Sequence, residues 1–280
     1  MKDVFKALSE RINIEPGDYT DQEGFIMCGK CNTRRQTEID CPFERKPVKM
    51  PIMCKCRSEE CERQEEAARR LNFEMKVERL RRDGLSDPEY SRWTFESDDT
   101  RNPLISCACR KYVEEWEHMK SDNVGLLFYG NVGVGKTFYA CCIANALLDK
   151  CVPVLVTSFP RILNRIQSSG WTEDRSGFID KLQRYDLLVI DDLGVERSTD
   201  FALEQVFMVI DTRYRSGKPL IITTNLSPAD IKKPDNIAYE RVYDRILQNS
   251  LPVKMTGESR RKEIAARKRE KYQGYLGLES

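Results

Sequence analysis

Residues 130–137 read G-N-V-G-V-G-K-T, a run that permits few folds. Its spacing is that of the phosphate-binding loop G-x-x-x-x-G-K-[ST]. An apolar run at 124–129 precedes the loop, and a helical pattern at 136–149 follows it. A strand, a loop and a helix in this order place backbone N–H groups and a helix N-terminus around a phosphate. The sequence therefore predicts a nucleoside triphosphate site.

The predicted nucleotide-binding residues are Gly130, Asn131, Val132, Gly133, Val134, Gly135, Lys136, Thr137 and Phe138. Within this set, the Lys136 ammonium group is expected to reach the β- and γ-phosphates. The Thr137 hydroxyl is expected to bind Mg²⁺. Both residues open the helix that follows the loop.

Two further apolar runs end in polar residues that suit the same chemistry. The run at 187–190 is followed by Asp191 and Asp192, and Asn225 comes shortly after the run at 220–223. In an open α/β sheet, ligands bind at the carboxyl ends of the strands. We therefore expect Asp191 to contact Mg²⁺, directly or through water, and Asp192 to orient the attacking water. Asn225 could contact that water or simply turn the chain.

Short apolar runs alternate with helical stretches through the second half of the chain. Strands are expected at 124–129, 152–157, 187–190 and 220–223, with helices near 136–149, 160–168, 177–184 and 201–215. This rhythm predicts an α/β fold, a parallel sheet flanked by helices on both faces. Residues 57–83 lack glycine and proline and predict an exposed connecting helix that ends near Gly84.

The order of these motifs resembles that of the AAA+ ATPases of the DnaC/DnaI helicase-loader family, which share their core with the IstB-like transposition helpers. The resemblance covers roughly residues 90–265. It rests on the loop at 130–137, D-D-L-G at 191–194, T-T-N at 223–225, E-R-V-Y-D-R-I at 240–246 and R-W-T-F-E at 92–96. It implies an AAA+ P-loop NTPase fold preceded by a small Cys-rich zinc module and a helical linker.

The resemblance also implies a division of the chain into four segments. Residues 1–62 would form a zinc-binding module that contacts the helicase, and residues 63–88 a helical linker. Residues 89–265 would form the AAA+ ATPase domain, and residues 266–280 a basic C-terminal tail.

Several roles around the phosphates follow from the resemblance alone. It gives Asn225 the sensor-1 position and Arg261 the sensor-2 position, with Arg260 as the alternative. It gives Arg245 the arginine-finger position, from which a guanidinium reaches the γ-phosphate of a neighbouring subunit, an effect worth about 10³–10⁵ in rate. Arg241, one helical turn earlier, is the second candidate. Either arginine could instead form a surface ion pair. A finger of this kind implies self-association into an ATP-dependent oligomer.

Members of this family form spirals around single-stranded DNA. The positions that would face the pore are Arg165, Thr199 and Phe201, where a cation meets phosphates and a ring stacks on bases. Phe201 could equally pack its own helix. Many AAA+ proteins have Glu where this chain has Asp192, which is one methylene shorter and suits a slow, switch-like ATPase.

Six of the 11 cysteines lie among the first 61 residues. The predicted zinc ligands are Cys28 and Cys31, a C-x-x-C pair, with Cys54 and Cys56, a C-x-C pair. Two close thiolate pairs suit tetrahedral Zn²⁺. Cys41 and Cys61 are alternative ligands, and an iron–sulfur cluster or a redox pair are the other interpretations. Because so small a module usually needs a metal to fold, we expect a structural site.

The balance of charge limits how the chain can bind DNA. It has 46 Lys+Arg and 45 Asp+Glu, a net charge of +1, with a mean hydropathy of −0.57. This excludes a protein that coats DNA with its whole surface, so DNA contacts must be local, at pore positions or on a basic helix predicted at 257–271. No apolar run approaches the roughly 18 residues of a membrane span. We expect a cytoplasmic protein without a membrane partner.

Three functions remain open from the sequence. The first is an ATP-dependent loader of a replicative helicase in replication initiation or restart, with ATP, Mg²⁺ and Zn²⁺ as cofactors and a hexameric helicase and single-stranded DNA as partners. The second is an IstB-like transposition helper that acts with a transposase. The third is a nucleotide-switched adaptor that hydrolyses little ATP.

Overall fold

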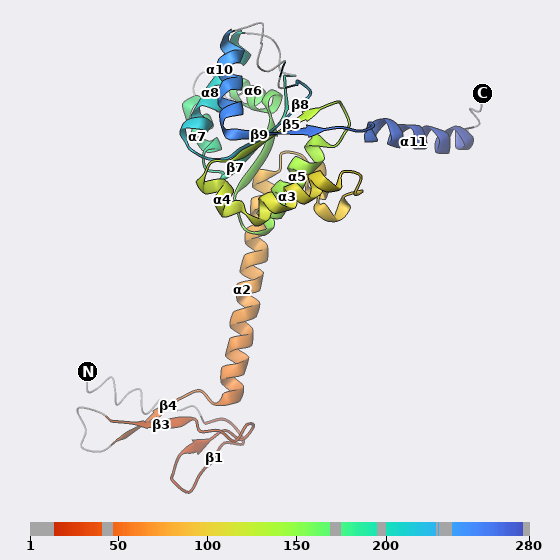
Figure 1. Cartoon of the computed structure of the whole chain (residues 1–280). Coiled ribbons are helices and arrows are strands. Elements are labelled where there is room, and N and C mark those ends of the chain that lie inside the picture. Colours follow the sequence, from red (N-terminus) through yellow and green to blue (C-terminus); the bar gives the residue numbers. More distant parts are fainter. Residues whose placement is uncertain are drawn as a thin grey trace. The chain divides into compact units, whose positions relative to one another are not determined.

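The computed structural model describes residues 14–40, 47–168, 175–194, 200–227, 229 and 237–276 (Figure 1). The chain divides into two compact units, Met1–Glu74 and Met75–Ser280. Their boundary falls inside helix α2 (Lys55–Gly84). Among the described helices, none combines the length and the apolar character that a membrane crossing requires.

The first unit consists of two short antiparallel ribbons. Strand β1 (Tyr19–Thr20) pairs with β2 (Ile26–Met27), and β3 (Gln36–Ile39) pairs with β4 (Val48–Pro51). In the described part of this unit, the buried apolar side chains are Phe25, Cys28 and Cys54. A core this small supplies little hydrophobic stabilisation, so the fold depends on other links.

Helix α2 confirms the connecting helix expected at 57–83. Gly84 is its one buried residue, and ion pairs one turn apart, such as Arg69 with Glu65 and Arg70 with Glu74, run along its surface. Each exposed pair of this kind contributes about 0.3–0.5 kcal/mol. The charge pattern is therefore that of a solvated helix.

The second unit is built on a five-stranded parallel sheet with the strand order β6-β7-β8-β5-β9. The strands are β5 (Gly125–Gly130), β6 (Val154–Ser158), β7 (Leu187–Leu193), β8 (Leu220–Thr224) and β9 (Ser250–Met255). The first four confirm the strands expected from the sequence. Strand β9 lies at an edge of the sheet and was not expected.

Alternate residues of the central strands enter two separate cores. Leu126, Phe128 and Val189 pack on one face of the sheet, whereas Leu127 and Leu188 pack on the other. This alternation is the two-residue period of a strand buried on both faces. The sheet is therefore the middle of three layers.

Helices cover both faces, as the sequence predicted (Figure 1). The first face carries α3 (Pro103–Glu114), α4 (Trp116–Ser121) and α5 (Lys136–Asp149), and the second carries α6 (Phe159–Ser168), α7 (Arg175–Leu182), α8 (Asp200–Arg215) and α10 (Ile237–Asn249). Two short 3₁₀ helices, η1 (Pro88–Arg92) and η2 (Phe95–Ser97), precede them. Helix α11 (Arg260–Leu276) follows β9 and confirms the basic helix expected at 257–271.

Candidate functional site

The phosphate-loop motif joins β5 to α5 through three glycines with positive φ. The φ angles are 139° at Gly130, 85° at Gly133 and 101° at Gly135. L-residues rarely adopt this region, so the loop requires glycine at these positions. A Cβ at Gly135 would also lie 2.4 Å from Nη1 of Arg260. The backbone thus curls tightly before α5 begins at Lys136, which leaves the N-terminus of that helix facing the loop.

Lys136 is 6% exposed and lies inside this loop. Its ammonium group donates hydrogen bonds of 2.9 Å to the Gly130 carbonyl and 2.8 Å to the Asn131 carbonyl. A third bond of 2.8 Å goes to Oδ1 of Asn225. Burial lowers the pKa of Lys136, while the nearby Asp192 carboxylate favours its charged form. The amine is held where it can meet a phosphate bound by the loop.

Asp191 sits at the carboxyl end of β7 and is 8% exposed. Its Oδ1 accepts a hydrogen bond of 2.7 Å from the Thr137 hydroxyl and one of 2.6 Å from the Thr223 hydroxyl. Burial raises the pKa of Asp191, and the two hydroxyls oppose that effect. A threonine hydroxyl beside a carboxylate is the oxygen pair with which P-loop proteins hold Mg²⁺. The residues therefore fit this ion.

Asp192 has a left-handed backbone with φ of 54°. The pairing of β7 with β8 shifts register between Ile190 and Leu193, so Asp192 lies on a bulge. Its N–H donates a 2.9 Å hydrogen bond to the hydroxyl of Thr223. The bulge separates two adjacent carboxylates, so that Asp191 is buried and Asp192 half-buried.

The described geometry brings together four residues predicted from three separate motifs. Lys136, Thr137, Asp191 and Asn225 meet at the carboxyl ends of β5, β7 and β8. The arrangement can bind a triphosphate, hold a divalent cation and place a side-chain amide near the terminal phosphate. The sequence did not predict Thr223 as a site residue, although it predicted Asn225, the last residue of the same T-T-N run.

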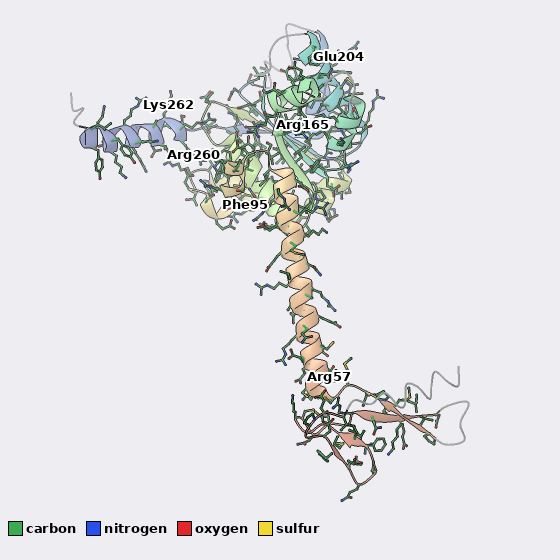
Figure 2. All side chains as sticks on the ribbon, turned by 180° about the vertical axis from the view of Figure 1, so that it is seen from behind. Arg57, Phe95, Arg165, Glu204, Arg260 and Lys262 are labelled. Atoms are coloured by element: carbon green, nitrogen blue, oxygen red, sulfur yellow. The ribbon has the colours of Figure 1, made fainter. Side chains whose placement is uncertain are left out.

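The beginning of α11 lies directly on the phosphate loop. The Arg260 N–H donates a 3.0 Å hydrogen bond to the Gly133 carbonyl, and its guanidinium forms a 2.7 Å ion pair with Asp99. Arg260 is labelled in Figure 2. The guanidinium also lies 5.8 Å from the centre of the Phe138 ring. Arg261 lies close enough for its charge to favour ionised Asp191. Arg261 forms no ion pair among the described residues, whereas the Arg260 guanidinium is paired with Asp99.

The segment Asp98–Arg101 was not expected to take part in the site. Besides the Asp99 pair, Arg101 forms hydrogen bonds of 2.6 and 3.2 Å with the carboxylate of Glu263 in α11. Tyr139 donates a 3.0 Å hydrogen bond to Asp98. Nothing in the local sequence indicates these partners, because each joins segments that only the tertiary fold brings together.

The two candidate finger residues lie on α10 in different surroundings. Arg245 forms a 2.7 Å ion pair with Asp211 of α8, and its guanidinium lies 4.6 Å from the centre of the Phe207 ring. Arg241 is exposed and has no ion pair within the described part of the chain. An ion pair thus engages Arg245, as the alternative interpretation allowed, although its partner is Asp211 on another helix.

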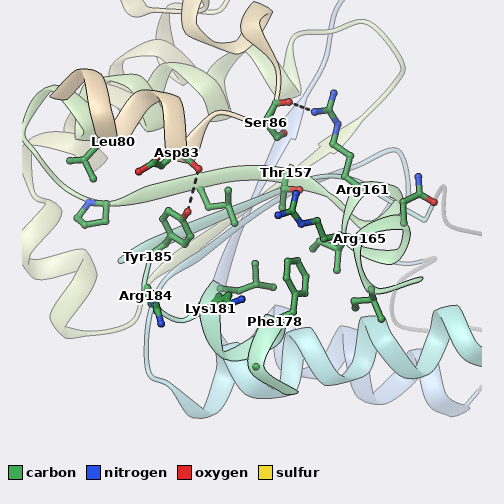
Figure 3. A pocket seen from close by; sticks show the side chains of 17 residues that line it. Leu80, Asp83, Ser86, Thr157, Arg161, Arg165, Phe178, Lys181, Arg184 and Tyr185 are labelled. Carbon is green, nitrogen blue, oxygen red and sulfur yellow. Dashed lines mark hydrogen bonds between the residues drawn. The ribbon is translucent and has the colours of Figure 1, made fainter. Parts of the chain in front are cut away.

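The predicted DNA contacts are only partly described. Arg165 is exposed on α6 and lines a cavity of about 1210 Å³, together with Arg161, Lys181 and Arg184 (Figure 3). Phe201 is half-buried and packs against the core of the second face. Thr199 lies outside the described residues. The structure therefore leaves the DNA role of all three residues as a prediction.

The four cysteines predicted as ligands converge in the first unit. Every pair of sulfur atoms among Cys28, Cys31, Cys54 and Cys56 lies within 4.8 Å. The Cys28–Cys56 and Cys54–Cys56 separations are 3.7 and 3.5 Å, close to the edge of about 3.8 Å that a tetrahedron with 2.3 Å Zn–S bonds would have. A hydrogen bond with Thr33 lowers the pKa of the Cys31 thiol to about 6. This donor set fits zinc.

Backbone hydrogen bonds hold each of the two cysteine pairs in place. The Cys28 N–H bonds to the Thr33 carbonyl, and the Cys28 carbonyl accepts from Asn32, which closes a tight turn around the first pair. The Cys54 carbonyl accepts from the first turn of α2 and places the second pair at the start of that helix. Cys61 lies farther along α2 and is not part of the cluster, and Cys41 lies outside the described residues.

Comparison with known proteins identifies the family of this chain. The model of the family described as IstB-like ATP binding protein matches residues 57–268. The chain belongs to this family. As an IstB-like ATP-binding protein, it has an AAA+ P-loop fold, with a parallel sheet flanked by helices.

Curated relatives of this IstB-like protein include replicative helicase loaders. It is 28% identical over 211 residues to the replicative helicase loader DnaC of Escherichia coli, covering 72% of this chain and 82% of the relative. It is 26% identical over 208 residues to the loader DnaI of Bacillus subtilis, covering 69% of this chain and 66% of the relative. A crystal structure of a DnaC helicase loader matches with a TM-score of 0.53 at 23% identity, over 61% of this chain and 100% of that one, which supports the fold.

Proposed function

We propose that this protein is an ATP-dependent loader of a replicative hexameric helicase. The observation that carries the proposal is a four-thiol module placed ahead of a complete ATP site, in a chain related to two helicase loaders over 69–72% of its length. Residues 1–62 would bind the helicase, and residues 63–88 would form the helical linker to the ATPase domain. Residues 89–265 would bind ATP and DNA, and residues 266–280 would form a basic tail.

The cysteine module would hold one structural Zn²⁺ through Cys28, Cys31, Cys54 and Cys56. The ion supplies four strong bonds where the described part of the unit buries few apolar side chains. It would fix the start of α2 against the two ribbons, because Cys54 caps that helix. A rigid module of this kind can present a defined surface to a partner protein.

The ATP site would work as a slow switch. Lys136 would neutralise the β- and γ-phosphates, and Thr137 with Asp191 would hold Mg²⁺, which stabilises the negative charge of the triphosphate. Asp192 would orient the attacking water. Its shorter side chain and its position on a bulge favour slow turnover, since the carboxylate reaches less far than a glutamate would.

Hydrolysis would depend on a neighbouring subunit. Arg245 would supply the finger, and Arg261 and Asn225 would contact the γ-phosphate of their own chain. For Arg245 this requires release from Asp211, to which it is paired. Arg241 is exposed on the same helix and is the alternative finger. Single-stranded DNA would bind the oligomer at Arg165, Thr199 and Phe201.

A pull-down of the cognate hexameric helicase with the full chain tests the proposal. We expect capture of the helicase by wild-type protein, and loss of capture when Cys28 and Cys54 are both replaced by serine. A Cys61→Ser variant is the matched control, because Cys61 lies outside the cluster. Absence of capture by wild-type protein, with and without ATP, would contradict the proposal.

The IstB-like family model favours a transposition helper as the second candidate. Such a protein would bind double-stranded DNA and a transposase, and would not capture the helicase. The cysteine module argues against this candidate, because the IstB-like helpers that the sequence resembles typically begin with a helical module. A preference for duplex over single-stranded DNA in direct competition would support the helper and not the loader.

A further inference from the structure

Helix α11 continues past the ATP site as a basic surface. It holds seven Lys or Arg, of which Arg260 and Arg261 lie at the ATP site, and two Glu. Since the net charge of the chain is only +1, the rest of the protein is acidic on balance. From Ile264 onward, every side chain described in this helix is exposed. Lys262, near the start of the helix, is labelled in Figure 2.

Aromatic side chains interrupt this basic surface at a helical spacing. Tyr272 is 47% exposed and Tyr275 is 78% exposed, with their ring centres 6.0 Å apart. The Lys271 ammonium group lies 5.7 Å from the Tyr272 ring. Residues 268, 271, 272 and 275 are separated by three or four positions, so they occupy neighbouring places on one side of the helix.

Arg269 lies three positions before Tyr272 and so borders the same surface. Arg267 pairs with Glu263, but Lys268, Arg269 and Lys271 form no ion pair among the described residues. Covering an exposed tyrosine pair with a partner would be favourable, since apolar surface then leaves water. Among the described residues, the helix therefore presents three cations without an ion pair beside two solvent-exposed tyrosine rings.

Single-stranded nucleic acid matches both features. Lysine and arginine side chains neutralise the backbone phosphates, and bases stack on aromatic rings without regard to sequence. An acidic protein surface would satisfy the charges but would leave the tyrosine faces without flat partners. We propose that Lys268, Arg269, Lys271, Tyr272 and Tyr275 form a contact surface for single-stranded DNA.

This inference rests on the proposed function, because it adds a second DNA contact to a protein proposed to act on single strands. The first turn of α11 ties this surface to the ATP site. Arg260 bonds to the loop residue Gly133, and Glu263 bonds to Arg101. DNA bound by the later turns of α11 would thus be connected to the phosphate loop through the same continuous helix.

Fluorescence anisotropy with labelled oligo-dT tests the surface on the full chain. Lys268→Ala, Arg269→Ala and Lys271→Ala together should weaken binding and reduce the slope of log K against log salt by about 2, because each phosphate contact contributes about 0.7. Tyr272→Ala with Tyr275→Ala should weaken binding about tenfold or more. The paired phenylalanine variants should bind like wild type, because they keep the rings.

The matched control removes the same charge from another exposed helix. Arg69→Ala, Arg70→Ala and Lys76→Ala lie on α2, and we expect this triple variant to keep the wild-type salt slope. All variants should bind a fluorescent ATP analogue with wild-type affinity, which shows that the core is intact.

The outcomes separate this inference from the proposed function. Wild-type DNA affinity in both α11 variants would overturn the inference and leave helicase capture untouched. The inference would also be overturned if the wild-type chain did not bind oligo-dT. If the α11 substitutions alter sedimentation of the chain without DNA, a second copy is the occupant of the surface and the inference is wrong. Loss of helicase capture with normal DNA binding would overturn only the loader proposal.

Discussion

The Lys136 ammonium group donates a 2.8 Å hydrogen bond to the side-chain oxygen of Asn225, although 89 residues separate the two in sequence. Lys136 begins α5 after the phosphate loop, and Asn225 follows β8. Since β5 and β8 are neighbours in the sheet, their carboxyl ends place the two side chains together. The residue proposed to sense the γ-phosphate and the lysine proposed to bind the phosphates are therefore in direct contact.

Replacing either partner should separate ATP binding from hydrolysis. Lys136→Ala removes the cation that meets the phosphates, and we expect ATP affinity to fall by at least about tenfold, as for the loss of one charge-assisted contact. Asn225→Ala should leave affinity within about threefold of wild type and reduce phosphate release more strongly. Titration of a fluorescent ATP analogue and a phosphate-release assay measure the two effects, and equal losses of affinity in both variants would contradict these roles.

Asp192 allows its chemical role to be separated from its backbone role. Asp192→Asn removes the negative charge but keeps a residue that tolerates positive φ, so hydrolysis should fall while Tm stays near wild type. Asp192→Ala should lose about 1 kcal/mol in addition, which lowers Tm by about 2–4 °C. Calorimetry with a phosphate-release assay distinguishes them. Unchanged hydrolysis in the asparagine variant would remove Asp192 from the reaction.

The cysteine cluster should bind one zinc ion per chain. Elemental analysis of purified protein should give one equivalent, and single serine substitutions at Cys28, Cys31, Cys54 or Cys56 should reduce it. Cys61→Ser should keep the full equivalent. A strong chelator should unfold the first unit while the ATP site still binds nucleotide, because the two lie in separate compact units. Full zinc content in the cluster variants would contradict the site.

The arginine finger predicts rescue between two inactive proteins. Arg245→Ala keeps its own ATP site but supplies no finger to the neighbouring subunit, whereas Lys136→Ala has an impaired ATP site but keeps its finger. A mixture of the two should recover about a quarter of wild-type hydrolysis, as random pairing of competent sites and fingers allows. Asp211→Ala is the control for the intramolecular ion pair, and it should hydrolyse ATP on its own. Rescue by Arg241→Ala in place of Arg245→Ala would reassign the finger.

Arg213 should be important for stability and not for chemistry. It is 1% exposed and donates to the carbonyls of Tyr185, Asp186 and Pro219. Arg213→Met would leave these buried acceptors without their donor and should cost about 2–4 kcal/mol. Urea denaturation measures the loss. ATP affinity of the folded variant should be unchanged, and a selective loss of affinity would contradict this structural role.

Patterns that depend on neighbouring residues predicted much of the fold. The four central strands are runs of apolar residues because both of their faces are buried, and this makes them visible in sequence. Strand β9 was missed because it is an edge strand that contains Pro252 and exposes Leu251. Proline is tolerated there, since an edge strand can leave one N–H position unpaired.

In the candidate site, too, some residues could be predicted from the sequence and others depend on tertiary contacts. The loop residues and the two close cysteine pairs have a fixed local spacing, and Asp191 directly follows an apolar run, so all of them are visible in the sequence. Only the fold brings Asp191 to Thr137 and joins the two cysteine pairs. The left-handed Asp192 and the Arg245–Asp211 pair could not be predicted. The first arises from a register shift between strands and the second from the packing of α10 on α8, and neither leaves a local pattern.

A size-resolved mass measurement with circular single-stranded DNA, ATP and the cognate hexameric helicase tests the central claim most directly. With the wild-type chain, we expect helicase bound to DNA at equilibrium, after passing through a complex that contains both proteins. With Lys136→Ala, the helicase should stay off the circle. Equal amounts of helicase on the DNA with and without the wild-type chain would contradict the account.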